Sequence, residues 1–260
     1  MATGGISINP RKEAARIESF VRKIVKDSSA KGVVLGLSGG IDSAVVGAAC
    51  MRALGKDRVL VLLMPSDHTP EVDVSDALKM ADAWGVRALK IPISRITELI
   101  TSSAKVQGTK IAKANVEARL RMILLYYYAN SLGYLVAGTG DRSEEEMGFY
   151  TKFGDGGVDF LPIAHLFKTQ VRQLGAYLRV PKSVVDKPAS PQLWPGHKAS
   201  DELPAEYDKL DVLLHEVFDL KASASAAARK AKVPPSVVER AMRMHRNSSH
   251  KRALPPSLLG

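Results

Sequence analysis

The chain has 260 residues, of which 45% are hydrophobic, 25% are charged and 6% are aromatic. These values are typical of a folded globular protein and exclude wholesale disorder. The 37 basic and 27 acidic residues give a formal net charge of +10, which favours an anionic partner such as a nucleotide, a nucleic acid or a phosphorylated metabolite. The one cysteine, Cys50, excludes an internal disulfide framework and any metal site built from several cysteines. No apolar run of about 18 residues and no secretory signal is visible, so we expect a cytoplasmic protein without a membrane segment.

Helices and strands are predicted to alternate through the first half of the chain. Apolar residues at helical spacing predict helices over residues 10–27, 43–54, 71–84 and 111–132, with a short helix near residue 96. Short apolar runs predict strands over residues 33–37, 59–64, 86–93 and 134–137. This alternation indicates a three-layer α/β fold with a parallel sheet of about five strands between helices. Because such sheets bind ligands at the carboxyl ends of their strands, we expect functional loops to begin near Ser38, Pro65, Ser94 and Gly138.

The second half of the chain has a different pattern. Residues 187–204 contain four prolines and little periodicity, which predicts a mobile loop or lid. Helices are expected over about 206–220, 222–230 and 237–246. Residues 221–252 carry nine Lys or Arg against one acid, Glu239, so this basic helical tail holds +8 of the net charge of +10. We expect residues 1–260 to form a single domain with its core in residues 10–254.

The loop most suggestive of chemistry lies between the first predicted strand and the helix after it. It reads Gly36-Leu37-Ser38-Gly39-Gly40-Ile41-Asp42-Ser43. Two glycines let the backbone approach a ligand closely, and successive N–H groups at a helix start form a nest for an anion. Asp42 would repel phosphate in such a nest unless it held a magnesium ion bridging to the phosphate.

This loop is not a Walker A motif, because no lysine follows its glycines. It could be a tight turn without a chemical role. It also fits the G-x-S-x-G nucleophile elbow of serine hydrolases, although an elbow normally follows several earlier strands. The third interpretation is a resemblance: Ser38 to Ser43 match the S-G-G-x-D-S signature of the PP-loop enzymes, which cleave ATP between the α- and β-phosphates and transfer AMP.

Further segments resemble one family within that class, the ammonia-dependent NAD synthetases, and most closely their short archaeal-type branch. The matching segments are residues 115–119, 138–144, 148–159, 187–194 and 250–252, together with Lys168. The resemblance covers about residues 10–254 and keeps the family's order. It implies a PP-loop fold of the Rossmann-like type, and an enzyme that adenylates deamido-NAD with ATP and then amidates it with ammonia, releasing AMP and pyrophosphate.

The resemblance also implies roles for individual residues. ATP contacts would be made by Gly36, Leu37, Ser38, Gly39, Gly40, Ile41, Asp42, Ser43, Thr139, Lys168 and Ser190. Deamido-NAD contacts would be made by Arg119, Lys152, Asp159, His250 and Lys251. Asp42 and Glu144 would hold magnesium, and Lys168 would stabilise charge on the leaving pyrophosphate. No general acid or base is assigned, because the substrate carboxylate and ammonia are themselves the nucleophiles.

The family resemblance further implies a homodimer with the dinucleotide site near the subunit interface. No glutaminase domain is recognised, so we expect free ammonia, or ammonia from a separate glutaminase, as the nitrogen source. Residues 195–204 depart from the acidic, glycine-containing segment of many relatives, and Ser190 stands where other branches have threonine. The simpler interpretations are a solvated Lys168 at a helix start, a surface role for Arg119 and a solvated helix face at 144–146.

Three other functions compete with this one. A PP-loop tRNA-modifying enzyme would suit the basic tail, but the chain lacks the paired cysteines of many such enzymes, and we expect no nucleic-acid partner. A serine hydrolase would depend on Ser38 and need no ATP. A nucleotide sensor would bind ATP without releasing pyrophosphate.

Overall fold

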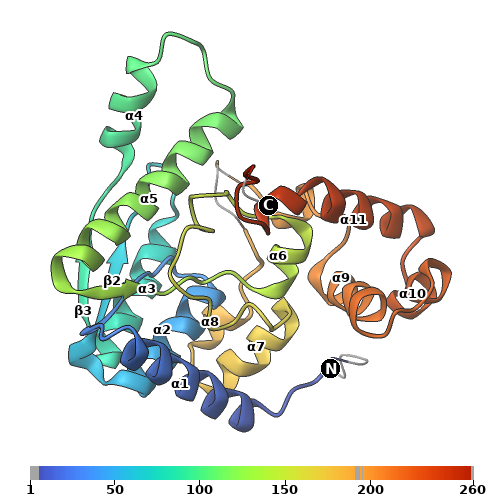
Figure 1. Cartoon of the computed structure of the whole chain (residues 1–260), viewed down its shortest axis with the longest axis horizontal. Coiled ribbons are helices and arrows are strands. Elements are labelled where there is room, and N and C mark those ends of the chain that lie inside the picture. Colours follow the sequence, from blue (N-terminus) through green and yellow to red (C-terminus); the bar gives the residue numbers. More distant parts are fainter. Residues whose placement is uncertain (1–5, 191–193, 195, 259–260) are drawn as a thin grey trace.

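The computed structural model describes residues 6–190, 194 and 196–258, and it contains a parallel sheet between layers of helices (Figure 1). The strands are β1 (Gly32–Gly36), β2 (Val59–Leu63), β3 (Arg87–Lys90) and β4 (Tyr134–Val136), in the order β3-β2-β1-β4. All three neighbouring pairs are parallel. The sheet of the described residues thus has four strands where about five were predicted. One isolated parallel bridge, between Ala137 and Phe160, extends the pairing beyond β4.

The predicted helices are present, with small shifts at their ends. Their bounds are α1 (Pro10–Asp27), α2 (Ile41–Leu54), α3 (Glu71–Trp84), α4 (Ser94–Ser103), α5 (Lys110–Leu132), α6 (Arg142–Met147), α7 (Lys168–Tyr177), α8 (Lys182–Val185), α9 (Tyr207–Leu214), α10 (Ala224–Ala231) and α11 (Pro235–Asn247). Helices α6, α7 and α8 were not predicted as separate elements. The helix expected over 206–220 is divided into α9 and a π-helical segment, His215–Asp219.

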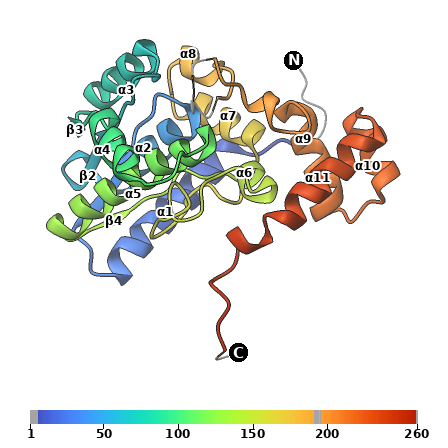
Figure 2. The same cartoon turned by 90° about the horizontal axis from the view of Figure 1, so that it is seen from above.

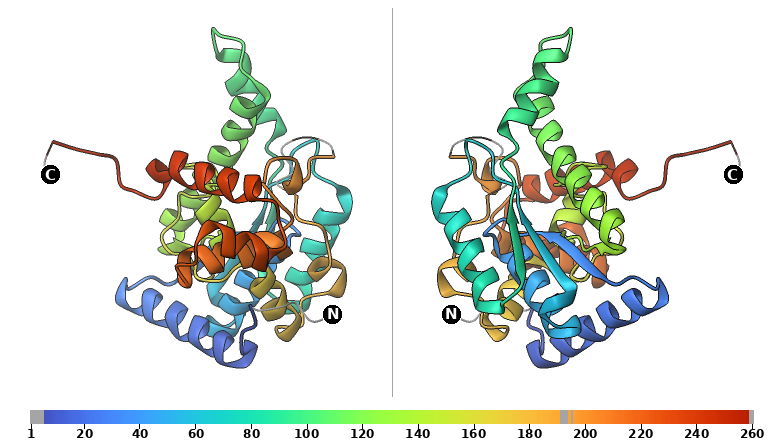
Figure 3. Two further views of the ribbon diagram at one scale, coloured as in Figure 1. Left: turned by 90° about the vertical axis from the view of Figure 1, so that its right-hand side faces the viewer. Right: turned by 90° about the vertical axis from the view of Figure 1, so that its left-hand side faces the viewer.

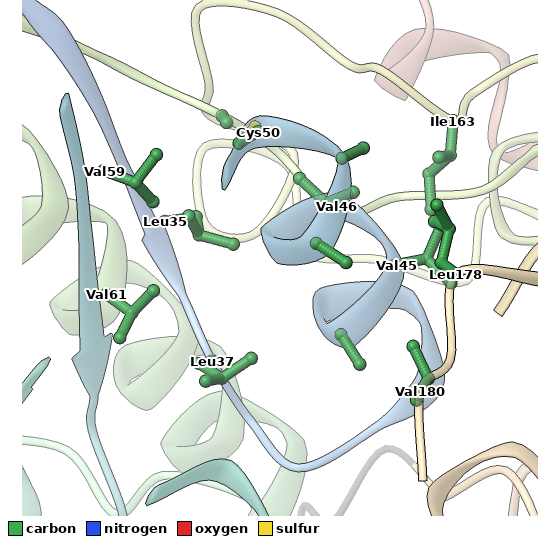
Figure 4. Packing of buried hydrophobic residues seen from close by; sticks show 14 of the residues in the cluster. Leu35, Leu37, Val45, Val46, Cys50, Val59, Val61, Ile163, Leu178 and Val180 are labelled. Atoms are coloured by element: carbon green, nitrogen blue, oxygen red, sulfur yellow. The ribbon is translucent and has the colours of Figure 1, made fainter. Parts of the chain in front are cut away.

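Side chains alternate between the two faces of the sheet, which builds two apolar layers. On one face, Val33 and Leu35 of β1 pack with buried residues of α1, α2, α3 and α7. On the other face, Val34 of β1 and Leu60 of β2 pack against α5. Figure 4 shows the first layer, in which Val46 and Cys50 of α2 lie near Leu35 and Val59 of the strands. The three-layer α/β prediction is therefore confirmed.

Strand β3 is shorter than the predicted run over 86–93 for a physical reason. Ile91 and Ile93 still donate backbone hydrogen bonds to Leu63 and Pro65. Pro65, which follows β2, has no N–H to donate back to β3, so regular pairing ends at Leu63 and Lys90. β3 is also an edge strand, and its end residues Arg87 and Lys90 are exposed, as is usual for sheet edges.

A second, helical core lies beside the sheet. Helices α9, α10 and α11 bury Leu210, Leu213 and Leu214 together with Ala227 and Ala241. Figure 2 shows these helices grouped at one end of the molecule, with the C-terminal segment leading away from them. Among the described residues, no helix is long and apolar enough to cross a membrane.

One pair of helices extends beyond the rest of the fold. Figure 3 shows α4 and the first turns of α5 projecting as a hairpin. Part of the predicted lid, residues 191–193 and 195, lies outside the described residues. Its remainder includes a short 3-10 helix, Ala199–Asp201.

Candidate active site

A pocket of about 470 Å³ opens at the carboxyl ends of β1, β2 and β4. Three of the four loops expected to be functional contribute to it, through Ser38, Pro65 and Gly138. Ser94, the start of the fourth loop, instead lines a separate hollow beside α3. The pocket therefore lies where the strand order of a parallel sheet predicts a ligand site.

The loop after β1 is held by its own two serines. The Ser43 hydroxyl accepts a 3.2 Å hydrogen bond from the Ser38 N–H and lies 3.1 Å from the Ser38 hydroxyl. The Gly40 N–H donates to the Ser38 hydroxyl at 3.2 Å. The hydrogen bonds that the structure describes for the Ser38 hydroxyl thus connect it within the loop, whereas a hydrolase elbow would pair it with a histidine.

Gly39 adopts a conformation that other residues rarely take. Its φ is +79°, and a Cβ at this position would lie 2.3 Å from the Asp73 carbonyl oxygen. The loop backbone therefore lies directly against the first turn of α3, and only glycine fits there. Helix α2 begins at Ile41, two residues earlier than predicted, so Asp42 lies in its first turn.

Lys168 joins the loop to helix α6. Its ammonium lies 2.7 Å from Asp42 Oδ2, 2.9 Å from Glu144 Oε1 and 3.1 Å from Asp141 Oδ2. The Lys168 side chain is 2% exposed, so it is not the solvated lysine of the simpler interpretation. We call these four residues the lysine–carboxylate cluster.

The position of Lys168 depends on a buried network behind it. The Lys168 N–H donates to the Ser143 hydroxyl at 3.0 Å, and this hydroxyl donates to Asp211 at 2.6 Å. The other Asp211 oxygen accepts from the Thr169 N–H at 2.8 Å. These bonds satisfy backbone N–H groups at the start of α7 and hold its first residue against α6 and α9.

The charges of the lysine–carboxylate cluster shift one another's pKa values. Burial alone would lower the pKa of Lys168, but Asp141, Asp42 and Glu144 together raise it well above its ordinary value. Burial raises the pKa of Asp141 well above its usual range, although Lys168 opposes this shift. Burial also raises the pKa of Glu144, to about 7. The ammonium of Lys168 therefore stays charged at neutral pH and can oppose negative charge in the pocket.

Asp42 and Glu144 fit the ligand set that magnesium prefers. Both are hard oxygen donors that line the pocket. The second Asp42 oxygen, Oδ1, is buried and has no hydrogen-bond partner. Among the described residues, no group of three or more His, Cys, Asp or Glu could hold a metal ion. A magnesium ion here would therefore take its other ligands from a bound phosphate and water, as is common for this ion.

The structure brings together most of the residues expected to bind ATP. Gly36, Leu37, Ser38, Gly40, Ile41, Asp42, Ser43, Thr139, Lys168 and Ser190 all line the pocket. Gly39 instead lies behind the loop, against Asp73. The Ser190 hydroxyl donates to the His197 carbonyl oxygen, which ties residue 190 to the second half of the predicted lid.

The residues expected to bind deamido-NAD fall into separate places. Lys251 lines the pocket, and its ammonium donates to the carbonyl oxygens of Gly148 and Tyr150. Outside the pocket lining, Arg119 donates to the Lys152 carbonyl oxygen at 3.2 Å, and the Lys152 ammonium donates to the His250 carbonyl oxygen. Both acceptors are main-chain carbonyl oxygens, so the three residues are neighbours beside the pocket, and we call them the basic group.

Asp159 does not join this basic group. Its carboxylate accepts a 2.7 Å hydrogen bond from the Val136 N–H and a 3.1 Å bond from the Tyr126 hydroxyl. The side chain therefore caps a backbone N–H at the end of β4, which is an edge strand. Each carboxylate oxygen can still accept a further hydrogen bond, so a contact of Asp159 with deamido-NAD stays a prediction.

Sequence reasoning missed three polar residues near the pocket. Asp141 is fully buried and caps α6, and its spacing from Glu144 matches a capping box. That spacing was a signal for the helix start but not for the contact with Lys168. Arg121 donates to the Met64 carbonyl oxygen at 3.1 Å, beside the pocket. Lys187 contacts the loop of residues 36–43, which we call the phosphate loop; it begins the matching segment 187–194, but the resemblance assigned it no role.

The fold and this site together define a PP-loop protein. A parallel sheet carries an anion nest after its first strand, and the nest adjoins a buried lysine held by carboxylates. A comparison with family models matches residues 13–255 to the model described as NAD synthase. The chain belongs to the NAD synthase family.

Individual relatives agree with this assignment. The chain is 49% identical to the NH(3)-dependent NAD(+) synthetase of Hyperthermus butylicus, with 94% of this chain and 89% of that protein covered. Among solved structures it resembles the NMN synthetase of Francisella tularensis, at 34% identity and a TM-score of 0.86, covering 96% of this chain and 98% of the other. It also resembles the NH3-dependent NAD synthetase of Campylobacter jejuni, at 29% identity and a TM-score of 0.83, with 96% and 99% covered. These findings give no support to the tRNA-modifying alternative.

Proposed function

We propose that this protein is an ammonia-dependent NAD synthetase, a ligase that converts deamido-NAD to NAD with ATP. The observation that carries this proposal is the lysine–carboxylate cluster in the pocket of the phosphate loop, in a chain 49% identical to a named synthetase. The nest would bind the ATP phosphates, and Lys168 would oppose the charge that builds up as pyrophosphate leaves.

The reaction needs no protein nucleophile. An oxygen of the nicotinate carboxylate attacks the α-phosphorus of ATP, and the bond from that phosphorus to the β-bridging oxygen breaks, releasing pyrophosphate. Ammonia then attacks the acyl carbon, loses a proton to water, and expels AMP with the former carboxylate oxygen. The chain's contribution is to position the reactants and stabilise charge. The buried surroundings of Lys168 strengthen its effect on that charge.

We also propose that the reaction requires magnesium, with Asp42 and Glu144 as its protein ligands. When bound, magnesium would neutralise phosphate charge during the transfer of AMP. The unpartnered Asp42 Oδ1 supports this assignment, since a buried carboxylate oxygen without a hydrogen bond is costly. Lys168 contacts both carboxylates, so its positive charge offsets their mutual repulsion before ATP binds.

The basic group of Arg119, Lys152 and His250 is proposed to bind the dinucleotide together with Lys251. Its position beside the pocket supports contact with a ligand that extends past the ATP site. Asp159 is proposed to contact the dinucleotide as well, through the acceptor positions that its bonds to Val136 and Tyr126 leave open.

A homodimer is proposed on the basis of the α4–α5 hairpin, residues 94–132. These helices and the loop between them expose large apolar side chains, including Leu99 at 68%, Val106 at 78% and Tyr127 at 67%. Exposed apolar surface of this kind often marks an interface. ATP as a substrate supports a cytoplasmic location, where free ammonia or a separate glutaminase would supply nitrogen.

The NMN synthetase structure suggests a second candidate, amidation of a mononucleotide instead of the dinucleotide. A substrate comparison separates the two. We expect kcat/KM to be highest with deamido-NAD. Lys152→Ala should lower kcat/KM for deamido-NAD and leave kcat/KM for nicotinate mononucleotide almost unchanged. A preference for the mononucleotide in the unmodified protein would overturn the dinucleotide proposal while keeping the ligase chemistry.

A further inference from the structure

We propose that Lys187 is a positioning residue for the phosphates of ATP, acting through the peptide bond between Gly39 and Gly40. The proposal rests on the proposed function, because it assumes that the phosphate loop binds ATP. Lys187 lies outside the loop signature and at the start of the predicted lid. Its role arises from three segments that meet at its ammonium.

The ammonium of Lys187 has three partners. It donates to Asp73 Oδ1 at 2.7 Å, to Asp76 Oδ2 at 2.9 Å and to the Gly39 carbonyl oxygen at 3.1 Å. Asp73 and Asp76 lie in the first two turns of α3, and Gly39 lies in the phosphate loop. One side chain therefore connects helix α3, the phosphate loop and the segment that leads to Ser190.

The bond to Gly39 fixes the orientation of a whole peptide plane. In a trans peptide, the carbonyl oxygen and the following N–H point in opposite directions. With the Gly39 oxygen held by Lys187, the Gly40 N–H is directed into the loop, where it donates to the Ser38 hydroxyl at 3.2 Å. The Ser38 hydroxyl in turn lies 3.1 Å from Ser43. Lys187 thereby sets the direction of an N–H in the anion nest.

Lys187 also neutralises negative charge near the loop. Gly39 lies directly against Asp73, as the 2.3 Å approach of its would-be Cβ to the Asp73 carbonyl shows. The carboxylates of Asp73 and Asp76 share the Lys187 ammonium with the Gly39 carbonyl, so they also lie close to the loop. Their negative charge would repel a phosphate bound there. The ammonium of Lys187 balances them. Burial lowers the pKa of Lys187, but its hydrogen bonds to the two carboxylates raise it overall, so the lysine stays charged.

Removing the ammonium while keeping the apolar stem tests this role. Loss of a charge-assisted hydrogen bond predicts that Lys187→Met raises the dissociation constant for ATP by about tenfold. The KM for deamido-NAD should change by less than about twofold in the same variant. Lys187→Arg keeps the charge and should recover most of the affinity. Lys182→Met, which removes an exposed partner of Asp186, is the matched control and should behave as the unmodified protein.

Hydrogen exchange gives a readout that does not depend on turnover. In Lys187→Met, amides of residues 36–43 should exchange faster, while amides of the β2 core should not change. ATP binding measured by calorimetry also needs no NAD formation, so both measurements remain valid if the unmodified protein makes no NAD. Failure of the proposed function and failure of the Lys187 proposal are thus distinguishable.

Several outcomes would overturn the proposal. Equal weakening of ATP and deamido-NAD would indicate a general structural role, as would failure of Lys187→Arg to restore binding. Unchanged exchange in residues 36–43 would remove the link to the loop. If Lys187→Met does not fold, Asp76→Asn weakens the same contact from the other side. It should speed exchange in residues 36–43, and exchange as in the unmodified protein would refute the link.

Discussion

The ammonium of Lys168 lies 2.7 Å from the carboxylate of Asp42, although the two residues are 126 positions apart in the sequence. This contact joins the start of α2 to the start of α7 on the pocket side of the sheet. It places a buried cation beside the loop that would receive the ATP phosphates.

Replacing Lys168 with methionine should damage both stability and function. Breaking a buried ion pair typically costs about 3–5 kcal/mol, because the remaining charges lose their partner. Lys168→Met leaves Asp141 fully buried beside Asp42 and Glu144 without a shared cation. Urea unfolding should show this loss, and NAD formation should stop. Unfolding at the same urea concentration as the unmodified protein would contradict the account, with Lys182→Met as the exposed control.

The two glycines of the loop should respond differently to alanine. Gly39→Ala combines a φ of +79° with a 2.3 Å clash against Asp73, so we expect a cost of about 1–3 kcal/mol or more and loss of ATP binding. Gly40→Ala meets only the Ser38 hydroxyl, at 3.3 Å, and should fold almost normally. Thermal unfolding compares the pair directly. Equal stability of the two variants would show that the contact with Asp73 is unimportant.

Lys152→Ala should separate the two ligands of the site. Lys152 belongs to the basic group with Arg119 and His250, outside the lining of the ATP pocket. Its loss should therefore raise the KM for deamido-NAD far more than the KM for ATP. Steady-state kinetics with each substrate varied in turn would check this. Similar changes in both KM values would mean that Lys152 is wrongly assigned.

The α4–α5 hairpin should control the oligomeric state. Leu99→Asp places a charge on the apolar surface of the hairpin, where Leu99 is 68% exposed in the single chain. If this surface is buried between subunits, the variant should be monomeric by light scattering while the unmodified protein is dimeric. Leu220→Asp changes a leucine of 58% exposure outside the hairpin and should leave the dimer intact. A Leu99→Asp variant that is still dimeric would exclude this surface as the interface.

Cys50 should make stability decrease at high pH. Burial raises the pKa of its thiol from 9.0 to about 12. Above pH 9.0 the unfolded chain releases a proton that the folded chain keeps, so the free energy of unfolding falls as pH rises toward about 12. The slope from this one group is at most about 1.4 kcal/mol per pH unit.

Urea titrations over this range, made in parallel with Cys50→Ala, isolate the effect of the thiol. The stability advantage of the unmodified protein over the variant should shrink as pH rises above 9.0. A constant difference would contradict the burial of the thiol. The folded protein should also resist thiol reagents at neutral pH, since the thiolate is the reactive form.

Local sequence patterns were sufficient to predict much of the fold and the position of the phosphate loop. The signature from Ser38 to Ser43 is contiguous, so its position after a buried strand could be predicted. Lys168 was identified by family resemblance alone, because its partners come from distant parts of the chain. The contacts of Asp141 and Lys187 could not be predicted, since the first arises where α6 and α7 meet and the second where the segment after α8 lies against α3.

Other differences have local physical causes. The absence of an N–H at Pro65, on the β2 side, ends regular pairing of β3 earlier than its apolar residues suggest. Asp159 is predicted to contact the dinucleotide, and its carboxylate also accepts hydrogen bonds from Val136 and Tyr126 that the sequence did not indicate. A family motif can thus preserve a residue's place in the chain while the contacts of its side chain remain unpredictable from the sequence.

The most direct test of the central claim follows an oxygen atom. The protein is incubated with ATP, magnesium, an ammonium salt and deamido-NAD whose nicotinate carboxylate carries labelled oxygen, and the products are weighed by mass spectrometry. Adenylation of the carboxylate predicts equal amounts of NAD, AMP and pyrophosphate, with one labelled oxygen in each AMP. Unlabelled AMP, or AMP and pyrophosphate without NAD, would contradict the account.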